Sequence, residues 1–353
     1  MCKGLSGWRT GIRVEDDQGI PVFKYDGWHW IPYIVQGQIW LLLRAGMTLF
    51  REYVTQHGLP DIIHAHNAQF AGFIASKIKQ EWGIPYVLTE HSSAYARGLI
   101  RRSEMVYIKD AFQLAEQRLV VSPTLGHVLE EIIGDSVRPW EWVSNILDRS
   151  FKNKALGKET NKDGDNPFRF LHIGSLIELK GQADLLRAFA SKFEGKSEIQ
   201  LRIGGSGPLR QELETLSKNL SIDQQVIFLG QLNREQVLAE MQTCDIYVLS
   251  SHYETFGVVL IEALACGKPV IATTCGGPDY IIQPENGVLV PPKDIVRLAE
   301  AMAVMKEKID RYDPIRIRQD CISRFGEQAI IDQLSSIYRE VQVTKTSSGI
   351  NYT

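Results

Sequence analysis

From residue 61 onward, short β-branched runs alternate with longer stretches in which apolar residues recur every three or four positions. The short runs predict buried strands, and the longer stretches predict amphipathic helices. Strands and helices that alternate in this way form a parallel sheet with helices packed on its faces. A polar stretch at 157–167, GKETNKDGDNP, interrupts the pattern and is typical of a connection between domains.

A second series of strands and helices begins at Phe168. Its strands end at glycine, serine or threonine just before the next helix, and doubly wound sheets bind ligands at these carboxyl ends. We therefore predict an α/β protein with two parallel-sheet domains, 1–150 and 151–326, whose strand ends face each other across a cleft. The helical stretch that opens 327–353 either closes the second domain or packs back onto the first.

Composition, charge and cysteine content narrow the class of protein. The 353 residues are 44% apolar and 23% charged, which fits a globular chain of about two domains. The net charge of -3 and the lack of a long basic run argue against a nucleic-acid partner. The five cysteines are scattered without CxxC spacing, so neither disulfides nor a zinc site is predicted. No apolar stretch is long enough for a signal peptide or a membrane span.

Two glutamates eight positions apart carry the candidate chemistry. Glu254 lies at a turn that contains glycine, and Glu262 lies in an apolar helical run, where an unpaired carboxylate would cost several kcal/mol. The N–H groups of Phe256, Gly257 and Val258 would open the helix and form an anion site. The pair suits a nucleotide sugar, which has a diphosphate in the middle and hydroxyl groups at both ends. The alternative is a solvated loop acid and a glutamate bonded to neighbouring backbone.

The stretch YETFGVVLIEALACGKPVIATTCGGPDYI at 253–281 resembles the E-x7-E signature of the retaining glycosyltransferases of family 4, which have the GT-B fold of two Rossmann-like domains. The resemblance implies that Glu254 faces the donor sugar and that the backbone of 256–258 holds the diphosphate. It also implies that Glu262 binds the ribose hydroxyls. The implied activity is transfer of a sugar from a nucleotide diphosphate to an acceptor hydroxyl, with retention, in surface polysaccharide or glycolipid synthesis.

Two further stretches of the second domain agree with this resemblance. In HIGSLIELKGQADLLRAF, Lys180 matches a lysine that stabilises the leaving diphosphate, whereas Ser175, after Gly174, stands where the family usually has arginine. Half of the usual positive clamp is therefore missing. IGGSGPLRQEL matches the GxGP turn at Gly205 and Gly207, where small residues allow close approach, although a purely structural role is an equal alternative. The third glycine of a dinucleotide fingerprint is absent, so we expect no NAD site.

Neither a cofactor nor a metal is expected. No DxD pair stands at a suitable place, so neutralisation of the donor phosphates would fall to Lys180 and the helix start rather than to an ion.

The first domain carries weaker signals. In YVLTEHSS, His91 matches a histidine that the family brings to the donor sugar, although a lone histidine is more often structural. In DIIHAHNAQFAGFIA, which also resembles a segment of the family, His66 or Asn67 would line the acceptor side, with a structural role as the alternative. The implied acceptor is a glycan or a lipid-linked molecule, and the implied location is cytoplasmic. RGLIRR at 97–102 is a candidate peripheral contact to anionic lipid at the inner membrane face, with a solvated segment as the alternative.

The N-terminal part departs from the family pattern. Members normally open with a strand such as ILHV and a glycine-rich loop, whereas this chain opens with MCKGLSGWRTGIRVEDD. We therefore expect the first strand and its loop to be missing from the first domain. Two other classes stay open: a sugar-nucleotide epimerase or phosphorylase of the same fold, and a non-catalytic nucleotide-sugar-binding protein.

Overall fold

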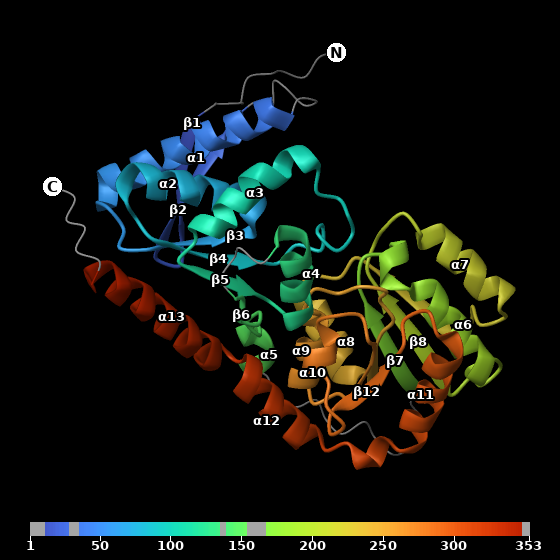
Figure 1. Ribbon diagram of the computed structural model, residues 1–353. Helices are drawn as coiled ribbons and strands as arrows, with labels where there is room; N and C mark the ends of the chain where they lie inside the picture. Colours follow the sequence, from blue (N-terminus) through green and yellow to red (C-terminus); the bar gives the residue numbers. More distant parts are fainter. Residues whose placement is uncertain (1–10, 28–34, 135–138, 154–166, 348–353) are drawn as a thin grey trace. The chain divides into compact units, whose positions relative to one another are not determined.

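The computed structural model describes residues 11–27, 35–134, 139–153 and 167–347 (Figure 1). The connection predicted at 157–167 lies outside the described residues, apart from Pro167. The chain separates into two compact units. Unit 1 comprises residues up to 120 together with 127–141 and 335 onward, and unit 2 comprises 121–126 and 142–334.

Unit 1 contains a hairpin and a parallel sheet covered by helices. Its elements are β1 (Gly11–Asp17), β2 (Ile20–Asp26), α1 (Val35–His57), β3 (Ile63–His66), the π-helical turn η1 (Asn67–Gly72), α2 (Phe73–Trp82), β4 (Tyr86–Glu90), α3 (Arg102–Leu114) and β5 (Gln117–Val120). Helix α4 (Pro123–Ile133), strand β6 (Glu141–Trp142) and helix α13 (Glu327–Ser347) have residues in both units.

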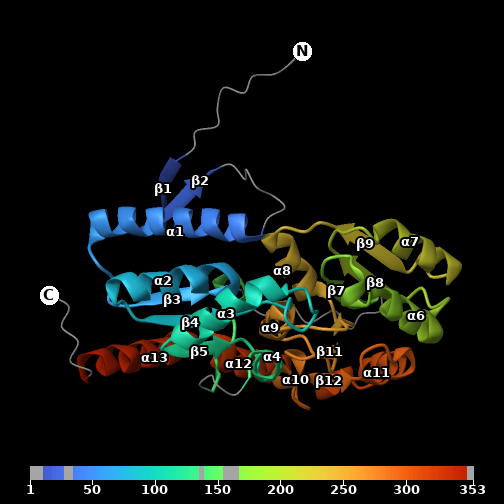
Figure 2. The same cartoon turned by 45° about the horizontal axis from the view of Figure 1, so that its top comes forward.

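The sheet of unit 1 has the strand order β3-β4-β5-β6, and β4 is parallel to both β3 and β5. Every residue of β4 is buried, because helices cover both faces of the sheet. Figure 2 shows α2 on one side, with α1 beyond it, and the C-terminal part of α13 on the other. The carboxyl ends of β3 and β4 lead into η1 and into the segment that begins at His91.

Unit 2 is a six-stranded parallel sheet between two helical layers. Its strands are β7 (Phe168–Ile173), β8 (Ile199–Gly204), β9 (Val226–Gly230), β10 (Ile246–Leu249), β11 (Val270–Thr273) and β12 (Gly287–Val290). Its helices are α5 (Arg149–Asn153), η2 (Glu178–Lys180), α6 (Gln182–Phe193), α7 (Arg210–Asn219), α8 (Arg234–Thr243), α9 (Val258–Ala265), α10 (Pro278–Ile281), α11 (Ile295–Glu307), η3 (Ile309–Arg311) and α12 (Pro314–Phe325).

The strand order of unit 2 is β12-β11-β10-β7-β8-β9, with all neighbours parallel. The chain starts in the middle at β7, runs outward to β9, and returns to the other side of β7 at β10. Such a sheet binds its ligand where the order reverses, so the carboxyl ends of β7 and β10 mark the expected site. The predicted α/β class with two parallel sheets is confirmed.

The core of unit 2 explains why these segments fold as they do. Phe170 of β7, Leu201 of β8 and Val248 of β10 are completely buried, and they pack with Leu186 and Phe189 of α6 in one hydrophobic cluster. Burying side chains of this size contributes roughly 1.5–3 kcal/mol each relative to exposure. Within the described residues, no helix is both long and apolar enough to cross a bilayer.

Candidate donor-binding site

The loops after β7 and β10 meet at the point where the strand order reverses. The Ser250 hydroxyl donates to the Lys180 carbonyl at 3.0 Å, and the His252 N–H donates to the Leu179 carbonyl at 2.8 Å. Gly181, which follows Lys180 and has a φ of +64°, faces the β10 loop so closely that a Cβ on it would stand 2.0 Å from the Ser250 carbonyl oxygen. The two loops therefore pack backbone against backbone, which fixes Lys180 beside the β10 loop.

Lys180 and Glu254, 74 residues apart in sequence, form an ion pair. The Ser251 hydroxyl donates to the same carboxylate oxygen at 2.8 Å. The two side chains keep 23% and 12% of their exposure, so a ligand can reach both charged groups. The structure thus brings together two of the three residues that the sequence nominated for catalysis, and it places a cation at the switch point of the sheet.

The backbone of Glu254 is held by the loop after β11. Its N–H donates to the Cys275 carbonyl at 2.9 Å, and its carbonyl accepts from the Gly277 N–H at 2.9 Å. Gly276 has a φ of +118°, and a Cβ on Gly277 would lie 2.2 Å from the Phe256 Cα. The paired glycines are needed for this close approach. These two glycines are functional positions that the sequence signature contains but does not single out, and the pair GG after a buried strand is the signal that marks them.

The start of α9 supplies N–H groups beside this pair. Gly257 has a φ of +100° and precedes the helix, which begins at Val258. No acceptor in the described part of the chain takes the N–H of Gly257 or Val258. The Phe256 ring is buried against Phe325, with ring centroids 5.8 Å apart, so only its backbone is available. The geometry suits an anion at this helix start.

Glu262 has a partner within the protein that the sequence pattern does not reveal. Arg234 of α8 contacts this buried carboxylate, with Nη1 2.5 Å from Oε1, and the predicted contact with ribose stays a prediction. Arg234 also contacts Asp148, with Nη2 3.0 Å from Oδ2. Burial raises the pKa of the Glu262 carboxyl, and Arg234 opposes that shift in pKa. Nothing in the local spacing pointed to Arg234, because the contact depends on how α8 packs beside α9.

The glycines of the β7 and β8 loops lie against each other. A Cβ on Gly205, where φ is +132°, would stand 1.9 Å from the Gly174 carbonyl oxygen, and one on Gly207 would stand 2.4 Å from the Leu176 carbonyl oxygen. Internal packing is therefore sufficient reason for glycine at 205 and 207. Ser175, which lies between Gly174 and Leu176 in the chain, is exposed, and its carbonyl accepts a hydrogen bond from the Gln182 side chain at 2.9 Å. A direct contact of these residues with a ligand stays a prediction.

A buried histidine lies beneath the same loop. His172 Nδ1 lies 3.0 Å from the Val248 carbonyl, so that nitrogen carries the proton, and Nε2 accepts from Gln182 at 3.2 Å. Burial lowers the pKa of His172 from 6.5 to about 4. The folded state therefore resists protonation of this ring.

The low pKa of His172 predicts acid sensitivity. A histidine with a lowered pKa adds stability above its ordinary pKa of 6.5, and this stability is lost as pH falls from 6.5 to about 4. Relative to His172→Gln, the wild type should lose about 3 kcal/mol across this window. Denaturant unfolding at several pH values measures the difference. His127→Gln, at an exposed position, is the control, and an equal loss in wild type and His172→Gln would contradict the prediction.

In unit 1 the structure brings three histidines into one stack. His66 Nδ1 and His91 Nε2 are 2.8 Å apart, and the His64 ring stacks on His66 with centroids 4.3 Å apart. His64 also contacts Thr89 and Tyr338, each at 2.6 Å. Burial lowers the pKa of His64 to about 4 and also lowers the pKa of His66. The two histidines that the sequence selected are thus direct neighbours rather than isolated rings.

A buried carboxylate that sequence analysis did not select fixes these segments. Glu90 accepts the N–H groups of Ala68, His91 and Ser92 at 2.8–2.9 Å and the Tyr95 hydroxyl at 3.2 Å. Burial raises the pKa of the Glu90 carboxyl, and these four donors oppose the shift in pKa. Glu90 thereby joins the start of η1 to the segment after β4. In the sequence, the signal for this residue is a glutamate at the end of the apolar strand YVLTE.

The predicted acceptor-side residue Asn67 opens η1 with a φ of +69°.

Within the residues that the structure describes, no group of three or more histidine, cysteine or carboxylate side chains is arranged to hold a metal ion.

Two family models match consecutive parts of the sequence. The model described as Glycosyltransferase Family 4 matches residues 16–151, and the model described as Glycosyl transferases group 1 matches residues 154–316. The chain belongs to the GT-B glycosyltransferases of the family 4 type.

Among related glycosyltransferases, an uncharacterised one of Methanocaldococcus jannaschii is 30% identical over 250 residues, which cover 66% of this chain and 63% of the relative. A D-inositol 3-phosphate glycosyltransferase of Corynebacterium efficiens is 28% identical over 324 residues, which cover 85% of this chain and 76% of the relative. The match thus spans less than two thirds of the first relative's length.

Solved structures share the fold of this chain. Sucrose-phosphate synthase from Thermosynechococcus elongatus has a TM-score of 0.73 at 24% identity, covering 88% of this chain and 81% of that protein. The Anabaena protein HepE, solved in complex with UDP, has a TM-score of 0.71 at 22% identity, covering 83% and 82%. The GT-B fold predicted from the sequence is confirmed.

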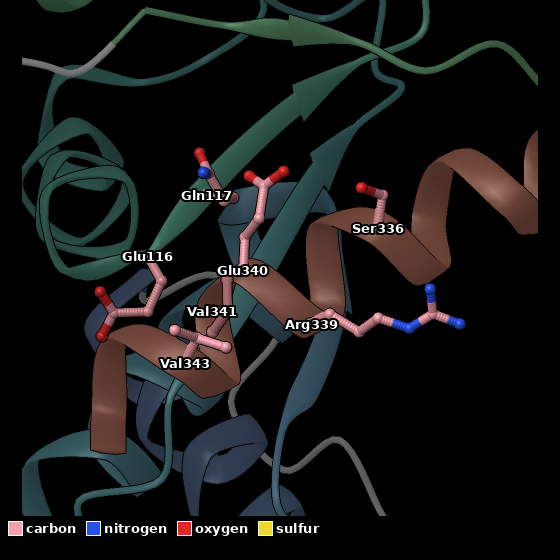
Figure 3. Close-up of a pocket in the computed structure, with 7 residues that line it drawn as sticks. All are labelled: Glu116, Gln117, Ser336, Arg339, Glu340, Val341 and Val343. Atoms are coloured by element: carbon pink, nitrogen blue, oxygen red, sulfur yellow. The ribbon is translucent and has the colours of Figure 1, made fainter. Parts of the chain in front are cut away.

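A pocket of about 500 Å³ in unit 1 lies apart from the predicted site residues (Figure 3). It is lined by Glu116, Gln117, Ser336, Arg339, Glu340, Val341 and Val343. Gln117 opens β5, so the pocket is at the amino end of that strand, whereas His66 and His91 are at the carboxyl ends of β3 and β4. None of the predicted site residues lines it.

Proposed function

We propose that the protein is a retaining glycosyltransferase that moves a sugar from a nucleotide-diphosphate donor to an acceptor hydroxyl. The observation that carries this proposal is the meeting of Lys180 and Glu254 at the switch point of unit 2, beside the start of α9. The roles assigned to single residues come from the family 4 resemblance and from the chemistry that each side chain can perform.

Lys180 and the N–H groups at the start of α9 meet the donor diphosphate in this proposal. The leaving nucleotide diphosphate gains negative charge as the glycosidic bond breaks, and a fixed cation lowers the energy of that state. Glu254 faces the donor sugar, and its ion pair with Lys180 holds both side chains in place before the donor arrives. Glu262 binds the ribose hydroxyls. No bound metal is included, because Lys180 and the helix start already provide positive electrostatic potential.

Retention would follow if the leaving phosphate oxygen deprotonates the acceptor hydroxyl on the face from which it departs. We assign His91 to the donor sugar and His66 with Asn67 to the acceptor side. The acceptor in this proposal is a glycan or a lipid-linked hydroxyl, used in surface polysaccharide or glycolipid synthesis. The segment RGLIRR at 97–102 has exposed arginines, and its contact with anionic lipid is part of the same proposal.

The first test is calorimetric titration of the protein with UDP, GDP and ADP, followed by incubation with the sugar nucleotides of the base that binds. We expect one nucleotide to bind with a dissociation constant (Kd) in the micromolar range, roughly, because Lys180 and the N–H groups at the start of α9 can form charge-assisted hydrogen bonds with its diphosphate. Incubation with a hydroxyl acceptor should release the nucleoside diphosphate, and NMR of the product should show the donor's anomeric configuration.

The products separate this proposal from the alternatives. A changed nucleotide sugar without acceptor would indicate an epimerase, and sugar phosphate formed from a glycan would indicate a phosphorylase. Binding without turnover over a broad acceptor panel would indicate a nucleotide-sugar-binding protein. If none of the three nucleotides binds, the donor class proposed here is wrong.

A further inference from the structure

We infer that Arg234 is a positioning residue for donor binding. It keeps the Glu262 carboxylate ionised and holds it so that one carboxylate oxygen contacts the arginine while the other can accept hydrogen bonds from a vicinal diol. The inference rests on the proposed function, because the diol is the ribose of the nucleotide donor. It adds a residue that lies outside the E-x7-E signature and outside the loops that sequence analysis selected.

The first observation is the burial of Glu262. Its side chain is only 2% exposed, and its helical neighbours Leu260, Ile261, Ala263 and Leu264 are completely buried. A carboxylate in such surroundings tends to take up a proton rather than stay charged. A protonated acid has one fewer acceptor oxygen for ribose hydroxyls. A function in ribose binding therefore requires a nearby cation.

The second observation is that the cation is held in place. Arg234 Nη1 lies 2.5 Å from Glu262 Oε1, and Nη2 lies 3.0 Å from Asp148 Oδ2. The guanidinium carbon also lies 5.0 Å from the centre of the Phe151 ring. Asp148 is fixed in turn by the Ser150 N–H at 2.8 Å and the Ser150 hydroxyl at 2.6 Å. These three contacts hold Arg234 in place although 51% of its side chain is exposed, so we interpret it as a support for Glu262 and not as a group that ribose displaces.

The third observation concerns the free oxygen. The described residues provide a hydrogen bond to Oε1 of Glu262 but none to Oε2. A carboxylate oxygen accepts more than one hydrogen bond, so Oε1 can keep Arg234 while Oε2 accepts from a hydroxyl. The charged groups that act on Glu262 are Arg234 from α8 and Asp148 from the segment before α5. Arg234 favours the carboxylate, and Asp148 opposes it.

The test compares Arg234→Gln and Arg234→Lys with the wild type in titrations with UDP, GDP and ADP, at about pH 8 and about pH 5.5. We expect Arg234→Gln to weaken binding of the nucleotide roughly tenfold at the higher pH, because Glu262 loses its charge-assisted partner. The loss should grow at the lower pH, since the pKa of Glu262 rises without the arginine and the carboxyl becomes protonated. Arg234→Lys should remove the extra loss at the lower pH, because a cation again stands beside Glu262, but it should restore only part of the affinity, because an ammonium lacks the two-pronged geometry that joins Glu262 to Asp148.

Controls separate this inference from the proposed function. Arg297→Gln, at an exposed arginine of α11 whose ion-pair partner among the described residues is Asp294, should leave the Kd unchanged at both pH values. If a nucleotide binds but Glu262→Gln does not weaken it, Glu262 is not a ribose ligand and the inference fails, while donor binding stands. Equal or tighter binding by Arg234→Gln at both pH values also overturns it. If no nucleotide binds the wild type, both the inference and the proposed function are wrong.

A second variant covers the case in which Arg234→Gln does not fold. Asp148→Asn keeps the contact between Arg234 and Glu262 but removes the second carboxylate that fixes the guanidinium. At about pH 8 the Glu262 carboxyl is ionised with or without Asp148, so only the orientation of the guanidinium changes, and we expect a several-fold weaker Kd for the nucleotide. The thermal midpoint should fall only slightly, because the Asp148 side chain is 44% exposed and asparagine can still accept from Ser150. An unchanged Kd in this variant would overturn the inference.

Discussion

Lys180→Met should lower turnover of the nucleotide sugar about 100- to 1,000-fold, which is the usual effect of removing one group that stabilises charge in a transition state. Methionine keeps the length and the apolar part of the side chain, so the change removes mainly the charge. The Kd of the nucleoside diphosphate should weaken less than turnover falls, because the charge on the diphosphate grows as the bond breaks.

The loop that carries Lys180 explains why the effect should be large. The segment GSLIELKG at 174–181 contains one basic residue, and Ser175 stands where the family usually has arginine. No second cation of this loop is available to compensate. The contact of Lys180 with Glu254 also means that the substitution leaves a carboxylate of 12% exposure without its cation, so the stability of the variant must be measured in parallel.

Lys192→Met is the matched control for Lys180→Met. Lys192 is exposed in the last turn of α6, so its replacement should change neither turnover nor nucleotide affinity. Steady-state kinetics with the sugar nucleotide, together with thermal unfolding of each variant, measures the two effects. A folded Lys180→Met variant that retains more than about a tenth of wild-type turnover would contradict the role assigned to the lysine.

Gly181→Ala should destabilise the protein by about 3 kcal/mol or more, the range expected when strain and a backbone clash combine. The new Cβ would lie 2.0 Å from the Ser250 carbonyl oxygen, so one of the two loops must move. Because Lys180 directly precedes this glycine and Ser250 begins the β10 loop, the same movement separates Lys180 from Glu254. We therefore expect nucleotide binding to weaken together with stability.

Gly195→Ala separates the clash from the cost of the backbone conformation. Gly195 has a φ of +75°, close to the +64° of Gly181, but a Cβ there would have no neighbour within 4 Å. Alanine in this left-handed conformation should cost only about 1 kcal/mol. Denaturant unfolding of both variants gives the comparison. Equal losses at the two positions would show that the contact with Ser250 adds no cost.

Much of the site could be predicted from the sequence because its signals are local. The run from Glu254 to Glu262 combines a turn, a helix start and an apolar helix face within nine positions, and each depends on neighbours two to four residues away. Lys180 and His91 each follow the end of a predicted strand, but it is the family 4 resemblance that selects them. Their chemical roles remain proposals, whereas the family and the fold are established.

The partners of these residues could not be predicted in this way. Arg234 lies 28 positions before Glu262 and on another helix, and Glu90 reaches 22 positions back to Ala68. Such contacts depend on how helices pack and on which loops meet at a sheet edge, and they leave no periodic pattern along the chain. The close approach of Gly181 to Ser250 is equally invisible, because a glycine in sequence does not show what its missing Cβ would meet.

The sequence by itself determined the alternation of strands and helices, the E-x7-E turn and the positions at which the strands end, since all of these follow from short-range patterns of apolar and polar residues. Only the tertiary structure decided the strand order that places β7 beside β10, the pairing of Lys180 with Glu254 and the support of Glu262 by Arg234. These features arise when distant segments bury their apolar faces together, and the charged groups left near the strand ends then bind whichever partners the packing has brought within reach.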